Sequence, residues 1–262
     1  MEKLDNKFFI ITGATGYIGS SVVEEICKMN GNSILLAKNL SKLNILKNKL
    51  SKKYKTKVKI FQCDLLNSKS VNSSIKKINK NYDYINGLVN CAYRGKTGGI
   101  NLISEKDFKD ASSINLISPF LLISKLKKLF EKASKKFKQT SSIVNVASMY
   151  GIVSPEIKNY KNAKIMNPIH YGATKSALIQ MSKYLACNLN VKHIRVNSIS
   201  PGAIPQITKK NKKLFHKLKK RIPLGRFGKP IEVAKPIIFL LSEDSSYING
   251  TNLIVDGGWT SW

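Results

Sequence analysis

The chain has 262 residues, of which 42% are hydrophobic and 23% charged, which predicts a globular core and excludes a disordered protein. No apolar run approaches the roughly 18 residues of a membrane span. The short run at residues 8–11 leads directly into a glycine turn, unlike a secretory signal, so we expect a cytoplasmic protein without a membrane partner. Four scattered cysteines lack the spacing of a zinc site or a disulfide framework, and no metal is expected.

The net charge is +30, with 45 Lys and Arg residues against 15 Asp and Glu residues. Lysine supplies most of the excess and is spread over segments 41–57, 125–138 and 209–220, without the aromatic side chains of a nucleic-acid stacking platform. The favoured interpretation is a solvated, lysine-rich surface, and nucleic acid is disfavoured as a partner. A specific polyanion site and an anionic small substrate are the alternatives.

Apolar runs that alternate with amphipathic segments define the expected elements in chain order. Strands are predicted at residues 7–12, 33–37, 57–63, 85–89, 142–147, 194–200 and 252–255. Helices are predicted at residues 20–29, 41–53, 68–80, 104–137, 169–190, 206–219 and 230–242. The alternation predicts an α/β fold: one Rossmann-type, doubly wound domain over residues 1–262, with a mainly parallel seven-stranded sheet and helices on both faces.

A glycine-rich segment at residues 13–19 separates the first strand from the first helix. Glycines permit a tight turn and the close approach of backbone to a pyrophosphate, and a helix N-terminus adds partial positive charge. The second strand ends near Lys38, where an acidic residue would bind a ribose 2′-hydroxyl; a cation there favours NADP over NAD. Alternatively, Lys38 is one more surface lysine.

Several polar or turn-forming residues follow directly after predicted strands. These residues are Gly13, Asp64, Asn90, Ser148 and Pro201. Because ligands of open α/β sheets bind outside the carboxyl ends of the strands, we expect these residues to line one site. Asp64 either accepts a hydrogen bond from an adenine amino group or caps the helix that begins near residue 68.

Tyr171 and Lys175 are four positions apart on a predicted helix and therefore share one face. Pro168, just before them, suits a first helical turn. An ammonium beside a phenol lowers the phenol pKa from about 10 toward the range useful for acid–base catalysis. The alternative is an ordinary surface pair. Asn115 lies inside a predicted helix, where asparagine is unfavourable, so it is either locally hydrogen-bonded or functional.

Motifs of one known family occur along nearly the whole chain. They lie at residues 12–19, 64–65, 88–92, 115, 144–148, 171, 175, 195–202, 223–228 and 247–258. Together they resemble the short-chain dehydrogenase/reductase family. The resemblance implies a hydride-transferring enzyme whose nicotinamide supplies the hydride.

The resemblance also implies a catalytic tetrad of Asn115, Ser148, Tyr171 and Lys175. Tyr171 would exchange a proton with the substrate oxygen, and Ser148 would hydrogen-bond that oxygen. Lys175 would bind the nicotinamide ribose and depress the tyrosine pKa, and Asn115 would hold a water that links Lys175 to solvent. The implied cofactor-binding residues are Gly13, Thr15, Gly16, Tyr17, Ile18, Gly19, Lys38, Asp64, Leu65, Asn90, Ala92, Tyr171, Lys175, Pro201 and Gly202.

Three features depart from the family pattern. The glycine spacing is that of the extended and atypical branches, and Tyr93 occupies a position where glycine is usual. Ser148 and Tyr171 are farther apart than is usual, so the added residues at 152–168 are expected to project over the substrate side. Segment 203–220 is also expected to form part of that side. The longer loop and the Trp-Thr-Ser-Trp tail resemble bacterial members linked to surface-polysaccharide or flagellin-glycan sugar pathways.

The leading hypothesis is an NADP-preferring oxidoreductase acting on a carbonyl or secondary alcohol, with a sugar derivative as a candidate substrate. A 3-oxoacyl-carrier-protein reductase is the enzymatic alternative. A non-catalytic nucleotide- or polyanion-binding protein is the alternative of another class. The resemblance also implies a homodimer or homotetramer that pairs equivalent long helices, and the apolar faces of segments 115–130 and 176–189 suit such pairing.

Overall fold

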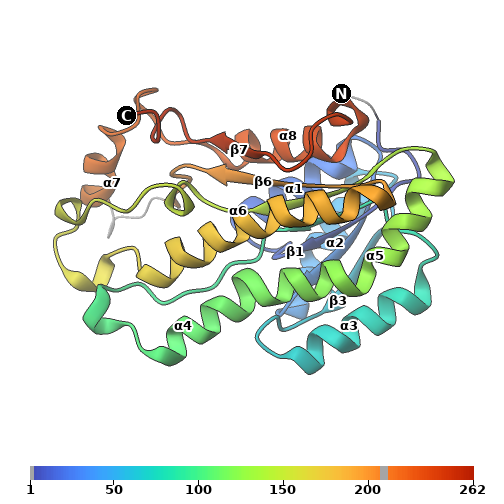
Figure 1. Cartoon of the computed structure of the whole chain (residues 1–262), viewed down its shortest axis with the longest axis horizontal. Coiled ribbons are helices and arrows are strands. Elements are labelled where there is room, and N and C mark those ends of the chain that lie inside the picture. Colours follow the sequence, from blue (N-terminus) through green and yellow to red (C-terminus); the bar gives the residue numbers. More distant parts are fainter. Residues whose placement is uncertain (1–2, 207–211) are drawn as a thin grey trace.

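The computed structural model describes residues 3–206 and 212–262 and is built around one sheet (Figure 1). Its strand order is β3-β2-β1-β4-β5-β6-β7, and all neighbouring strands are parallel. The strands are β1 (Phe8–Thr12), β2 (Asn32–Ala37), β3 (Val58–Gln62), β4 (Gly87–Asn90), β5 (Ser141–Val146), β6 (Ile194–Pro201) and β7 (Asn252–Val255). The strand order reverses between β1 and β4, which is where such sheets bind ligands.

Helices cover both faces of the sheet, as the alternating sequence pattern predicts (Figure 1). They are α1 (Tyr17–Lys28), α2 (Leu40–Lys53), α3 (Ser68–Asn81), α4 (Glu105–Ser112), α5 (Ser118–Phe137), α6 (Ile169–Leu189), α7 (Lys212–Lys219) and α8 (Pro230–Leu241). One face carries α1, α2 and α8, and the other carries α3, α5 and α6. The predicted doubly wound α/β fold is confirmed. Residues 207–211 of the predicted helix 206–219 lie outside the described residues.

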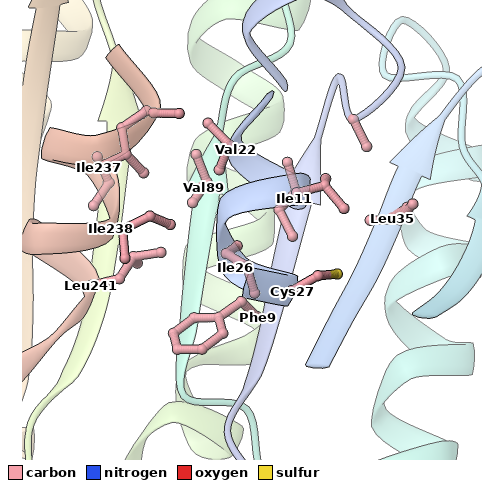
Figure 2. Close-up of a cluster of buried hydrophobic side chains, with 14 of the residues drawn as sticks. Phe9, Ile11, Val22, Ile26, Cys27, Leu35, Val89, Ile237, Ile238 and Leu241 are labelled. Atoms are coloured by element: carbon pink, nitrogen blue, oxygen red, sulfur yellow. The ribbon is translucent and has the colours of Figure 1, made fainter. Parts of the chain in front are cut away.

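The core consists of one apolar layer on each side of the sheet. Figure 2 shows part of the first layer, to which β1 contributes Ile11, α1 contributes Val22 and α8 contributes Ile237. The central strands are buried on both faces, which explains why β1 is a nearly continuous apolar run instead of an alternating one. Within residues 3–206 and 212–262, no helix combines the length and apolar character needed to cross a membrane.

Two predicted helix boundaries are wrong. The first helix begins at Tyr17 instead of residue 20, so Gly19 is helical and the turn ends at Gly16. The predicted helix 104–137 is two α-helices joined by a π-helical turn at Ser113–Ile117. Both differences lie at the carboxyl edge of the sheet, where the local backbone serves the candidate site.

Candidate functional site

The turn between β1 and α1 is shaped to receive an anion. Gly13 adopts a left-handed conformation with φ of +62°, and a Cβ there would lie 2.7 Å from the Cα of Ala92. A Cβ on Gly19 would overlap the carbonyl oxygen of Gly13, so α1 packs on the turn only with glycine there. Within the described chain, no side chain caps the first N–H groups of α1, which begins after Gly16. Free N–H groups at the positive end of a helix suit a phosphate.

A cavity of about 660 Å³ lies along the carboxyl ends of the strands, within the size range of cofactor sites. The predicted cofactor-binding residues that line it are Gly13, Thr15, Gly16, Tyr17, Ile18, Gly19, Lys38, Asp64, Leu65, Ala92, Tyr171, Lys175, Pro201 and Gly202. Asn90 is absent from this lining. It is still part of β4, and its side chain donates to Asn145 Oδ1 at 2.8 Å inside the core. Asn90 therefore links β4 to β5 and its side chain does not face the cavity.

Lys38 and Asp64 face each other at the end of the cavity formed by β2 and β3. The Lys38 Nζ lies 2.6 Å from the Asp64 Oδ2, and the Asp64 Oδ1 accepts from the backbone N–H of Leu66 at 3.1 Å. The helix cap of α3 is Asn67, whose side chain accepts from the first N–H groups of that helix. The alternative interpretation of Asp64 as the helix cap is therefore wrong.

The phenol and the ammonium of α6 lie at the other end of the cavity. Tyr171 hydrogen-bonds with Ser148, which lies two residues after the end of β5. The Lys175 Nζ is 6.0 Å from the centroid of the Tyr171 ring and donates to the carbonyl of Val146. Lys175 is only 3% exposed. Three of the four predicted catalytic side chains thus converge, although they come from segments distant in the sequence.

Burial dominates the electrostatics of this group. It raises the pKa of Tyr171 above its ordinary value of 10.0, and the hydrogen bond with Ser148 opposes that rise. Burial also lowers the pKa of Lys175 to about 8. The expected lowering of the tyrosine pKa is therefore wrong for the protein alone, because desolvation of both groups outweighs their attraction.

Asn115 lies in the π-helical turn that joins α4 to α5. Such turns are rare and recur at functional sites. Its Nδ2 donates to the Thr174 Oγ1 at 3.0 Å, and its buried Oδ1 has no partner among residues 3–206 and 212–262. The sequence left open whether Asn115 is locally hydrogen-bonded or functional. The Asn115 side chain does donate a hydrogen bond, but its partner is on α6, next to Lys175, and not in its own helix.

Comparisons with known proteins identify the family. A family model described as enoyl-(acyl carrier protein) reductase matches residues 13–260. The chain belongs to the short-chain dehydrogenase/reductase family of oxidoreductases. It is 29% identical over 260 residues to post-translational flagellin modification protein A of Campylobacter coli, covering 98% of this chain and 99% of that protein. It is 33% identical to the 3-oxoacyl-[acyl-carrier-protein] reductase FabG of Rickettsia typhi, covering 98% of both chains.

A solved short-chain dehydrogenase from Leptospira borgpetersenii with bound NAD⁺ has a TM-score of 0.85 against this structure. The two are 28% identical, and the alignment covers 98% of this chain and 94% of that one. The short-chain dehydrogenase/reductase assignment made from the sequence is therefore confirmed, together with its fold and its class of chemistry.

The cavity lining of this short-chain dehydrogenase/reductase also contains residues that were not among the predicted site residues, and Lys42, Tyr93 and Arg94 are those with a cationic or aromatic side chain. Lys42 follows Lys38 after about one helical turn, and Arg94 is one of only four arginines and comes just after a strand end. These sequence positions were the signals from which Lys42 and Arg94 could have been predicted to line the site. Tyr93 was noted only as a departure from the family, and its ring packs edge-on against Tyr171 with centroids 4.7 Å apart.

The enlarged loop 152–168 of this family member is tied to the loop that follows β4. The N–H of Gly98 donates to the carbonyl of Met166 at 3.0 Å, and the N–H of Gly99 donates to that of Ala163 at 2.8 Å. In Figure 1 the loop is the yellow-green segment between β5 and α6, drawn beside α7. The two loops therefore form one connected surface next to the start of α6.

An ion pair ties the other part of this loop to the C-terminal region. Glu156 accepts from Arg221 at 2.5 Å, and the Arg221 guanidinium lies 5.6 Å from the ring centroid of Trp259. Trp259 belongs to a small apolar cluster with Met149, Leu218 and Ile222. This cluster gives loop 152–168 a fixed support apart from the main core.

Proposed function

We propose that this protein is an NADP-preferring oxidoreductase that interconverts a carbonyl group and a secondary alcohol. The observation that carries the proposal is that Tyr171 and Lys175 line one end of the cavity and that Ser148 is hydrogen-bonded to Tyr171. The glycine turn and the uncapped start of α1 line the same cavity. One end thus suits acid–base chemistry on an oxygen, and the turn suits a pyrophosphate.

The residues that would hold a nicotinamide dinucleotide fit that group. Gly13 and Gly19 let the turn pack closely against Ala92 and α1, and the N–H groups after Gly16 lack side-chain partners in the described chain. When bound, the nicotinamide supplies or accepts the hydride. We assign the remaining cofactor contacts to the cavity-lining residues named above. Asn90 supports them only indirectly, through its bond to Asn145.

The chain's own part of the chemistry is to manage one proton. Tyr171 would donate it to the carbonyl oxygen during reduction and recover it from the alcohol during oxidation. Ser148 would donate a hydrogen bond to the same oxygen as negative charge develops there. Lys175 would stabilise the phenolate. The Oδ1 of Asn115, which has no partner within the described part of the chain, suits a water between Lys175 and solvent.

The preference for NADP rests on the cationic end of the cavity. Lys38, Lys42 and Arg94 line it, against one acidic side chain, Asp64. Asp64 is already paired with Lys38 and hydrogen-bonded to backbone. An excess of cations at the adenosine end favours a 2′-phosphate over a free 2′-hydroxyl.

For the substrate we propose a small carbonyl compound, with a sugar derivative as the first candidate. Loop 152–168 and segment 203–220, of which residues 207–211 lie outside the described chain, would form the substrate side of a single domain. The bond of Glu156 to Arg221, which follows the second segment, supports this proposal. The resemblance of the longer loop and the C-terminal tail to members of surface-glycan sugar pathways supports a sugar, and the similarity to a flagellin modification protein agrees with that resemblance. The resemblance to the carrier-protein reductase and the basic surface support the alternative, a 3-oxoacyl thioester on an acidic carrier.

We further propose a cytoplasmic homodimer or homotetramer. Ile117 at the end of the π-helical turn, Phe120 at the start of α5 and Tyr184 on α6 are each about half exposed or more, which suits pairing of these helices between copies. Light scattering of the purified protein would test the assembly.

The experiment that tests the function is a reduction assay with purified protein. Oxidation of NADPH, followed at 340 nm, should occur with one or more ketones of a panel that contains keto-sugars, β-keto esters and a 3-oxoacyl thioester. Saturable NADPH binding without any turnover would favour the non-catalytic alternative. Selective use of the thioester would favour the carrier-protein reductase.

A further inference from the structure

Tyr93 stands out among the cavity-lining side chains because its position is fixed from two directions. The segment before it is tied to β1, since Thr12 Oγ1 accepts from the N–H groups of Cys91 at 3.1 Å and Ala92 at 3.3 Å. Ala92 also packs against Gly13, where even a Cβ would come within 2.7 Å of its Cα. The backbone that leads from β4 to Tyr93 is therefore held in place by its contacts with the end of β1 and with the glycine turn.

The ring of Tyr93 lies against the reacting phenol. Its centroid is 4.7 Å from that of Tyr171, with an interplanar angle of 72°, and Lys175 Nζ is 6.0 Å from both centroids. Edge-to-face aromatic contacts of this kind are attractive and directional. A glycine at position 93 would leave this space to solvent or substrate.

On the side of Tyr93 that carries its hydroxyl, the lack of a side chain at Gly95 leaves room for that hydroxyl. A Cβ on Gly95 would lie 2.7 Å from the Tyr93 hydroxyl and 2.7 Å from Cε1 of the buried His170. His170 packs in turn against Phe108 of α4. Tyr93 is thus backed by a packed layer, although 45% of its own surface remains exposed toward the cavity.

We propose that Tyr93 is the positioning and specificity-determining residue of this site: it fixes and dehydrates the Tyr171 phenol and forms the wall that limits the group beside the substrate carbonyl. The inference rests on the proposed function and narrows its substrate class to carbonyl compounds with a compact substituent on one side. Burial keeps the pKa of Tyr93 itself well above its ordinary value, so Tyr93 remains a neutral wall.

The other groups that face Tyr171 are the same in the wild type and in the Tyr93 variants that a test needs. They are Lys175 on the same helix, Cys91 after β4, and Ser148 and Tyr150 after β5. Replacing Tyr93 leaves all of them in place. A change in the titration of Tyr171 would then report the loss of the ring, and Tyr93→Phe separates the ring from its hydroxyl.

The first test needs no substrate. The protein is labelled with [ζ-¹³C]tyrosine, the Tyr171 signal is assigned with Tyr171→Phe, and its chemical shift is followed against pH. In Tyr93→Ala the pKa of Tyr171 should fall toward 10, whereas Tyr93→Phe should titrate like the wild type. Tyr247→Ala, at a fully exposed tyrosine outside the cavity, is the matched control. An unchanged titration in Tyr93→Ala would overturn the positioning role, whether or not the protein proves to be a reductase.

The second test measures how strongly Tyr93 limits the size of the group beside the substrate carbonyl. Ethyl acetoacetate and ethyl benzoylacetate differ only in a methyl or phenyl group beside the ketone. The ratio of kcat/KM for the phenyl over the methyl ester should rise about tenfold or more in Tyr93→Ala and stay unchanged in Tyr93→Phe and Tyr247→Ala. Gly95→Ala, which displaces the Tyr93 ring, should lower kcat for both esters. Equal ratios in the wild type and Tyr93→Ala would overturn the specificity role while leaving the reductase function intact.

Discussion

Replacing Lys38 by glutamine should weaken the preference for NADPH over NADH. Lys38 is 65% exposed and its ammonium pairs with Asp64 at 2.6 Å, so it acts in a largely aqueous setting. Two unit charges at about 4 Å in water attract by about 1 kcal/mol. A phosphate monoester carries a charge of roughly −1.5 to −2. The expected loss is therefore about 1.5–2 kcal/mol, or about 10- to 30-fold in the affinity ratio.

Dissociation constants for NADPH and NADH, measured by fluorescence titration of both variants, provide the assay. Lys38→Asp should shift the ratio further, because its carboxylate repels a phosphate and accepts from a ribose hydroxyl. Lys53→Gln is a matched control, since Lys53 pairs with Glu24 at 2.7 Å outside the cavity. The effect should shrink as salt is raised. Equal weakening of both cofactors, or a ratio within threefold of the wild type, would refute the assignment of Lys38 to the 2′-phosphate.

Two further predictions concern the substrate side and the buried ammonium. Arg221→Glu should raise KM for the carbonyl substrate about two- to fivefold with little change in kcat, and Glu156→Arg in the same chain should restore it. A KM for the double variant as high as that for the single variant would contradict this role of the Glu156–Arg221 ion pair. The pKa of Lys175 falls to about 8 in the folded protein, so charging it opposes folding below that pH. Lys175→Met should be inactive, because it lacks the ammonium. It should also be up to about 3 kcal/mol more stable than the wild type in urea at pH 7, and this gain should disappear as the pH rises from 8 to 10.5. A stability gain over the wild type that is the same at pH 7 and pH 10.5 would contradict this prediction.

Much of the site was predictable because parallel strands end at one edge of their sheet. Residues that follow β1, β3, β5 and β6 meet at the cavity, as the sequence pattern requires. Asn90 shows the limit of this rule. A strand's last residue points to one face or the other according to register, and Asn90 pairs with Asn145 inside the sheet.

The remaining differences depend on contacts between segments distant in the chain. The π-helical turn around Asn115 exists where the helix meets α6, and no local sequence signal distinguishes it from a regular helix. The pKa direction of Tyr171 was mispredicted because the sequence shows the nearby lysine but not the burial of both groups. Tyr93 was visible as an unusual residue, whereas its contact with Tyr171 required the fold.

Tyr171→Phe tests the central claim most directly, because it removes the acid–base hydroxyl and keeps the ring packed against Tyr93. We predict that kcat falls by about 10²–10⁴-fold while the NADPH dissociation constant stays within about twofold of the wild-type value. Turnover within tenfold of the wild type, with the same substrate and cofactor, would contradict the account.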